Sequence, residues 1–92
     1  MSVRAAAVDA MWEKLEFVID RSGHHVSAKL YFDNVLVVRT RRSHGSGKIE
    51  GTIPDKIRQQ MRLNEGQFAD AINCPLKAAG YLDILKRKGF LP

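Results

Sequence analysis

The stretch RSGHHVSAKLYFDNVLVV, residues 21–38, determines the fold that the sequence predicts. Residues 24–32 alternate between apolar and polar side chains from Val26 to Leu30, and residues 35–42 begin with the apolar run VLVV, so we expect both stretches to form strands of one sheet. Asp33 and Asn34 separate these runs, and both residue types tolerate the positive φ that a two-residue hairpin turn requires. Residues 16–20 form a short segment with two β-branched side chains, which could be a strand or the tail of the preceding helix, and we favour a short strand.

A two-residue turn at 33–34 also predicts which strand residues face one another. Phe32 would lie opposite Val35, and the apolar face toward the helices would contain Val26, Leu30, Phe32, Val35 and Val37. The opposite, polar face would carry His25 across from Arg42, with Lys29 beside them. His24 would then fall on the apolar side, near the helices.

Helices are expected on both sides of these strands. Apolar residues at helical spacing predict a helix over 3–15, and Pro54 suits the first turn of a helix that continues to Leu63. Asn64 and Gln67 resemble a capping box, and Pro75 would begin a last helix that ends before Gly89. The predicted order is helix, three antiparallel strands, then three helices. This is a single α+β domain over residues 1–92, with helices on one face of one sheet.

Charge and composition indicate a polyanionic partner. The formal net charge is +5, and the basic residues gather in two places: Arg39, Arg41, Arg42, His44 and Lys48, and then Lys86, Arg87 and Lys88. Nucleic acid is the first candidate partner for such a domain, and a solvated basic face is the alternative. No apolar run approaches the roughly 18 residues of a membrane span. With no secretory signal in the first residues, we expect a cytoplasmic protein with no membrane contact.

His25 is the candidate catalytic residue. An imidazole beside cations suits phosphate chemistry, because the cations hold the phosphate and the imidazole takes or gives a proton. RNA supplies its own nucleophile, the 2′-OH. Neither a metal nor a cofactor is therefore required. Adjacent strand residues point to opposite faces, so His24 and His25 do not readily share a metal, and the single Cys74 excludes a four-cysteine zinc site. The expected RNA contacts are Lys29, Arg39, Arg41, Arg42, His44 and Lys48, and the alternative is an ordinary polar sheet face.

Two segments carry a family resemblance. FVIDRSGHHV, residues 17–26, resembles the strand–turn–strand of HicA-type toxins, in which a Gly-Ser-His turn opens the second strand. Here Gly23-His24-His25 takes that place, and His24 stands where the family usually has serine. KIEGTIPDKIRQQMRLNEGQF, residues 48–68, resembles the family's tail at Lys48, Ile57, Gln60, Leu63 and Phe68. The resemblance covers residues 11–72.

The resemblance implies a double-stranded-RNA-binding-like core over 1–63, of α-β-β-β-α order, with 64–92 as a helical extension. It also implies a bacterial or archaeal toxin that cleaves mRNA without a metal and is silenced by a HicB antitoxin. The role of the family's histidine would fall on His25. The serine of the turn is absent, the hairpin is longer and more basic, and the last twenty residues have no counterpart in a short HicA toxin. A divergent branch could keep RNA binding without cleavage.

The C-terminal residues 65–88 offer a different function. Their spacing is also that of a helix-turn-helix DNA binder, with Asn73-Cys74-Pro75 as the turn and 76–88 as the recognition helix. Gly80 would then lie inside that helix, at a cost of about 1 kcal/mol relative to alanine. The simpler interpretation is that these helices close the core over the sheet. A plain interaction module without a nucleic-acid partner is the third class.

Overall fold

The computed structural model describes residues 2–45, 47–73 and 75–91. Within these ranges the chain forms four helices and two small antiparallel sheets. The strands are β1 (Val3–Arg4), β2 (Val18–Asp20), β3 (His25–Phe32), β4 (Val35–Ser43) and β5 (Lys48–Ile49). The helices are α1 (Ala5–Lys14), α2 (Ile53–Gln60), α3 (Glu65–Ile72) and α4 (Ala78–Arg87). The predicted α+β class is therefore confirmed.

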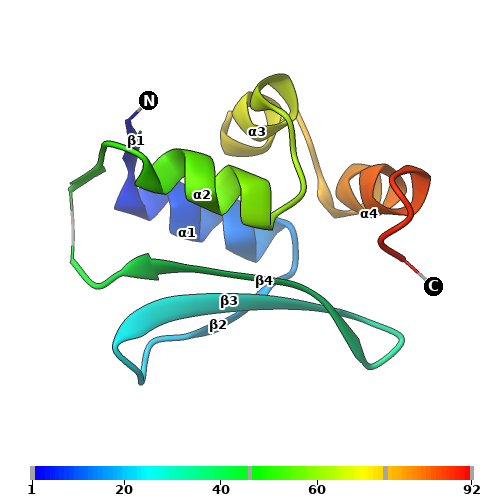
Figure 1. Ribbon diagram of the computed structural model, residues 1–92, viewed down its shortest axis with the longest axis horizontal. Coiled ribbons are helices and arrows are strands. Elements are labelled where there is room, and N and C mark those ends of the chain that lie inside the picture. The colour runs from blue at the N-terminus through cyan, green and yellow to red at the C-terminus, as the bar shows by residue number, and fades with distance from the viewer. Residues whose placement is uncertain (1, 46, 74, 92) are drawn as a thin grey trace.

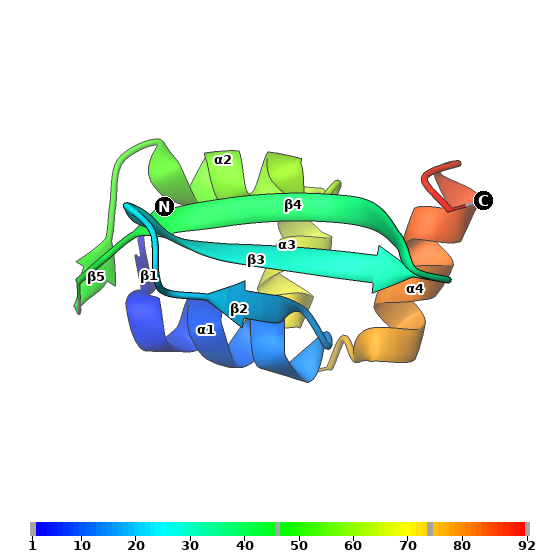
Figure 2. The ribbon, with the colours of Figure 1, turned by 90° about the horizontal axis from the view of Figure 1, so that it is seen from below.

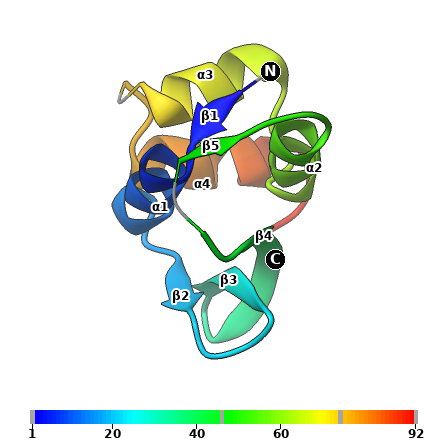
Figure 3. The same ribbon diagram turned by 90° about the vertical axis from the view of Figure 1, so that its left-hand side faces the viewer.

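The larger sheet has the strand order β2-β3-β4, and α1 and α2 lie across one of its faces (Figure 1). Helix α3 packs on α1, on the side away from the sheet (Figure 3). None of the four helices covers the other face of the sheet, which we call the open face (Figure 2). The largest fully buried side chains include Trp12, Tyr81, Phe68, Met11 and Leu15. The core therefore lies between the sheet and the helices.

The small sheet was not predicted. Val3 pairs with Ile49 and Arg4 with Lys48, and the Ala5 N–H donates to Gly47 O at 2.8 Å. These pairings tie the chain before α1 to residues 47–49, which follow β4. Helix α1 consequently begins at Ala5 and not at residue 3.

A β-bulge changes the predicted hairpin register. Phe32 pairs with Val35 and Tyr31 with Leu36, as expected, but the register then shifts and Leu30 pairs with Val38. The expected pairing of Leu30 with Val37 is therefore wrong, and every later residue of β4 moves to the opposite face. Val38 is buried in place of Val37, while Val35 is half exposed.

The shifted register turns two polar side chains of β4 toward the helices. Thr40 is buried, and its hydroxyl donates to Gln60 Oε1 at 2.7 Å. Arg42 is buried as well, so its predicted place across from His25 on the polar face is wrong. His24 is exposed in the turn before β3, which corrects its expected place near the helices.

Arg42 is held by Asp9 of α1 in a two-pronged ion pair. Arg42 Nε donates to Asp9 Oδ1 at 2.8 Å and Nη2 donates to Oδ2 at 2.7 Å. Arg42 Nη1 also donates to the carbonyl oxygens of Ser43 at 2.7 Å and Gly45 at 3.2 Å. The hydrogen bonds from Arg42 hold the pKa of Asp9 below its usual value. This one side chain thus connects α1, the end of β4 and the following loop.

The last two helices complete the core, as the simpler interpretation of 65–88 predicted. The capping box is confirmed, because Gln67 N donates to Asn64 Oδ1 at 2.8 Å and Asn64 N donates to Gln67 Oε1 at 3.0 Å. Helix α4 begins at Ala78, later than Pro75, and buries Tyr81, whose hydroxyl donates to Met61 O at 2.8 Å. Among the described residues, no helix is long and apolar enough to cross a membrane.

We expect Asp9→Asn to reduce the free energy of unfolding by about 3 kcal/mol, because it leaves the buried Arg42 without a counter-charge. Urea denaturation at neutral pH measures this. Asp83→Asn is the matched control, since Asp83 also meets an arginine, Arg87, at 2.7 Å but at an exposed site. That change should cost less than about 1 kcal/mol. Because the pKa of Asp9 is lowered in the folded state, the difference between wild type and Asp9→Asn should be complete above about pH 4, the ordinary pKa of an aspartate, and should be lost as the pH falls through the lower pKa of folded Asp9. Equal losses for the two variants would contradict this role of Asp9.

Candidate functional site

The open face carries a row of polar and aromatic side chains from β3. Buried and solvent-facing residues alternate along this strand, with Val26, Ala28 and Leu30 buried. The residues that alternate with these buried ones therefore project from the open face; they are His25, Ser27, Lys29 and Tyr31. Tyr31 is 48% exposed.

Strand β4 places two arginines beside this row. Arg39 pairs with Lys29 and Arg41 pairs with Ser27, so these side chains share the open face. Both arginines are exposed. On the other side of β3, Asp20 of β2 pairs with Ser27.

These side chains line a cleft of about 630 Å³, which we call the open-face cleft. Its lining is Asp20, Ser22, Gly23, His25, Ser27, Lys29, Arg39, Thr40, Arg41 and Gln60. The bulge in β4 therefore brings His25 together with two arginines and a lysine at one site.

The cleft is positively charged. Within the described residues, none of its three cations forms a salt bridge, and Asp20 is its single acidic residue. Asp20 Oδ1 accepts hydrogen bonds from Ser22 Oγ at 2.6 Å and Ser22 N at 2.9 Å. These bonds, and to a smaller extent the charge of Lys29, lower the pKa of Asp20. Three cations against one carboxylate suit an anionic ligand.

The predicted site residues divide into two groups. His25, Lys29, Arg39 and Arg41 line the open-face cleft. Arg42, His44 and Lys48 instead line a separate hollow of about 220 Å³ beside the small sheet. The buried, paired Arg42 has its guanidinium engaged by Asp9 and by the loop, so it presents little surface to a ligand.

His44 holds the turn that leads into His25. Its Nε2 lies 2.8 Å from Gly23 O. A carbonyl oxygen only accepts, so the ring nitrogen carries the hydrogen and donates it. The loop after β4 is thereby fixed to the turn between β2 and β3.

Tyr31, Asp20 and Gln60 were not predicted as site residues. The alternation along β3 put Tyr31 on the same face as Lys29, and this was the signal that could have identified it. Gln60 reaches the cleft from α2, and no spacing in the sequence indicates that approach. Cys74, predicted to lie in the turn of the possible helix-turn-helix, lies outside the described residues.

The basic side chains at the end of α4, which a helix-turn-helix DNA binder would use, mostly contact other groups of the chain. On α4, Arg87 Nη2 pairs with Asp83 at 2.7 Å, and Lys88 Nζ donates to Arg62 O at 2.6 Å. Two of the three cations in the basic cluster Lys86, Arg87 and Lys88 are thus engaged within the chain. We therefore place the candidate site on the sheet.

Comparison with known proteins leaves the site to be interpreted from its geometry. The chain matches no protein-family model, no curated protein and no solved structure. In the part of the chain that the structure describes, no three or more His, Cys, Asp or Glu side chains gather where they could hold a metal ion.

We expect His44→Ala to loosen the turn at residues 22–25 without unfolding the protein. A single exposed hydrogen bond contributes about 1 kcal/mol or less to stability. Native-state hydrogen exchange should be faster at the amides of this turn, and unchanged in α3. His24→Ala is the control, since His24 is exposed in the same turn and donates no side-chain hydrogen bond found among the described residues. Equal exchange in both variants would contradict the proposed restraint.

Proposed function

We propose that the open face binds single-stranded RNA and that His25 transfers a proton during its cleavage. One observation carries the proposal: His25 lines the same cleft as Lys29, Arg39 and Arg41. Cations in that arrangement hold phosphates, and an imidazole beside them is within the chemistry of general acid–base catalysis.

The binding half of the proposal depends on charge and on one aromatic ring. Lys29 and the two arginines supply positive charge that is not neutralised by salt bridges in the described residues. Tyr31 stands two residues beyond Lys29 on the same strand and presents a ring to solvent. Proteins that bind single strands combine a positive groove with aromatic rings on which bases stack. An open sheet face is one of the surfaces on which unpaired bases are displayed.

The cleavage half of the proposal follows from the nucleophile that RNA contains. Neutral His25 would take the proton of a 2′-OH, whose oxygen then forms a bond to the adjacent phosphorus. The bond from phosphorus to the 5′ oxygen breaks, and that oxygen takes a proton from water. Arg39 and Arg41 would stabilise the negative charge that develops on the phosphate. The products are a 2′,3′-cyclic phosphate end and a 5′-hydroxyl end.

The resemblance to HicA-type toxins gives this chemistry a cellular role. In that role the protein would be the RNA-cleaving toxin of a prokaryotic toxin–antitoxin pair, acting in the cytoplasm and silenced by a HicB-like antitoxin. His25 occupies the position that matches the family's histidine, and it lines the cationic cleft. As part of the same proposal, α1, the larger sheet and α2 would form the double-stranded-RNA-binding-like core of such a toxin.

For binding, we expect Arg39→Gln/Arg41→Gln to weaken affinity for single-stranded RNA. The plot of log affinity against log salt should become shallower by about 1.4, because each neutralised phosphate of a single strand contributes about 0.7. Fluorescence anisotropy over a salt series measures this. Lys77→Gln/Lys86→Gln removes the same charge from exposed positions outside the open-face cleft and serves as the control. Unchanged binding in the arginine variant would remove the open face from consideration.

For cleavage, we expect His25→Ala to bind RNA normally but to cleave it about 10²–10⁴-fold more slowly, the usual contribution of a general acid or base. Its unfolding free energy should be unchanged, because His25 is exposed. Overexpression of wild type, but not of the variant, should arrest growth.

RNA with a 2′-O-methyl group at the cleaved position supplies the matched substrate control. It should bind and resist cleavage, because its nucleophile is blocked. Cleavage that survives His25→Ala would exclude this role, and RNA binding without any cleavage by wild type would leave a binding protein.

A further inference from the structure

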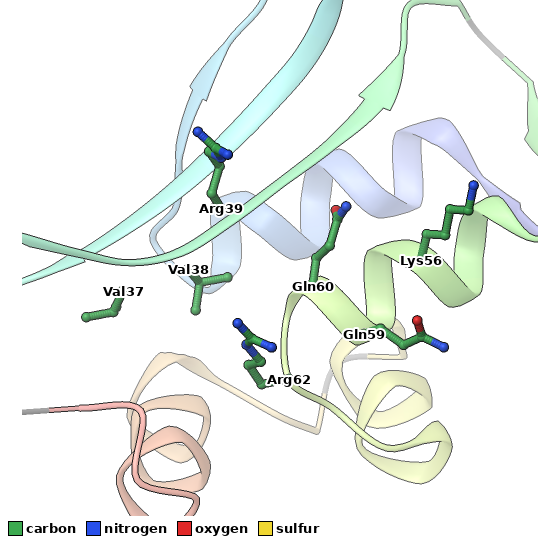
Figure 4. A pocket seen from close by; sticks show the side chains of 7 residues that line it. All are labelled: Val37, Val38, Arg39, Lys56, Gln59, Gln60 and Arg62. Carbon is green, nitrogen blue, oxygen red and sulfur yellow. The ribbon is translucent and has the colours of Figure 1, made fainter.

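A second cationic hollow lies on the other side of the β4 edge. It has a volume of about 420 Å³ and is lined by residues of β4, of α2 and of the turn that follows α2. We call it the β4–α2 groove, and its lining residues are Val37, Val38, Arg39, Lys56, Gln59, Gln60 and Arg62 (Figure 4). Its described lining contains three cations, Arg39, Lys56 and Arg62, and no acidic side chain.

The two hollows meet at the edge of the sheet. Arg39 and Gln60 line both the open-face cleft and the β4–α2 groove. In the part of the chain that the structure describes, β4 is the last strand on its side of the sheet, so no further strand separates the two hollows. In Figure 4, Gln60 points from α2 toward β4. Its Oε1 accepts a hydrogen bond from Thr40, which fixes it at the junction. The surface is therefore continuous from His25, across the β4 edge, to α2.

Arg62 is held in place at the far end of this groove. Its guanidinium carbon lies 4.7 Å from the centroid of the Phe90 ring, a cation–π contact. Its backbone has φ of 63°, a left-handed conformation that glycine adopts at less cost. Arginine adopts this backbone conformation at a higher cost than glycine, and its side chain places a positive charge in the groove. Figure 4 shows the side chain pointing toward β4.

We propose that the β4–α2 groove is a second phosphate-binding site, which receives the strand of RNA that leaves the open face. This inference rests on the proposed RNA binding. The strand crosses the β4 edge at Arg39, and its next phosphates lie against Lys56 and Arg62. Within the described residues neither Lys56 nor Arg62 forms a salt bridge, so both charges are available to phosphate.

The path predicts a dependence on RNA length. An oligonucleotide of about four nucleotides fills the open-face cleft alone, while one of about twelve also reaches the groove, within the usual site sizes of single-strand binders. Lys56→Gln/Arg62→Gln should therefore weaken the binding of the longer RNA and leave the shorter RNA unaffected. For the longer RNA, the salt plot should become shallower by about 1.4, and by about 0.7 for Lys56→Gln alone.

Lys77→Gln/Lys86→Gln is the control, because it removes two charges at exposed positions that line neither hollow. Lys56→Gln alone guards against a folding defect, since Lys56 is exposed on α2 and, among the described residues, makes no cation–π contact like that of Arg62 with Phe90. Thermal unfolding of each variant verifies that the fold is retained.

Three outcomes overturn the inference. If wild type does not bind the shorter RNA, both the proposed function and this inference fail. If it binds both RNAs and the groove variant behaves like the control, only the second site fails. If the groove variant binds RNA normally but loses affinity for a glutamate-rich peptide, the groove belongs to a protein partner.

Discussion

The ion pair between Asp9 and Arg42 is the interaction on which the arrangement of the sheet and helices depends. It joins α1 to the end of β4 through two hydrogen bonds of 2.8 and 2.7 Å. Arg42 faces inward because the bulge in β4 shifts the register by one residue. A buried guanidinium without a carboxylate would be strongly unfavourable, so the shifted register is compatible only with an acid at this point of α1.

The same bulge produces the candidate site. With Thr40 and Arg42 turned toward the helices, Arg39 and Arg41 project from the open face on either side of the buried Thr40. The unshifted register would have turned both of these arginines toward the core and left Arg42 beside His25. This bulge therefore separates the arginine that stabilises the fold from the two that line the open-face cleft.

The edge position of β4 gives the site its extent. A strand added beyond β4 would divide the open-face cleft from the β4–α2 groove, whereas in this sheet both are lined by Arg39 and Gln60. Exposed strand edges invite unwanted pairing, and charged side chains are a common means of preventing it. Arg39 and Arg41 place such charges on the edge strand β4.

The sequence by itself determined the α+β class, the hairpin turn at Asp33-Asn34, the capping box at Asn64 and the cluster of basic residues around β4. These features depend on local backbone preferences and on periodicity, which neighbouring residues express directly. Only the tertiary structure decided the register beyond Tyr31, the burial of Arg42, the exposure of His24 and the approach of Gln60 to β4. A bulge and a pairing between α1 and β4 depend on packing across many intervening residues, and that packing leaves no periodic signal in the chain.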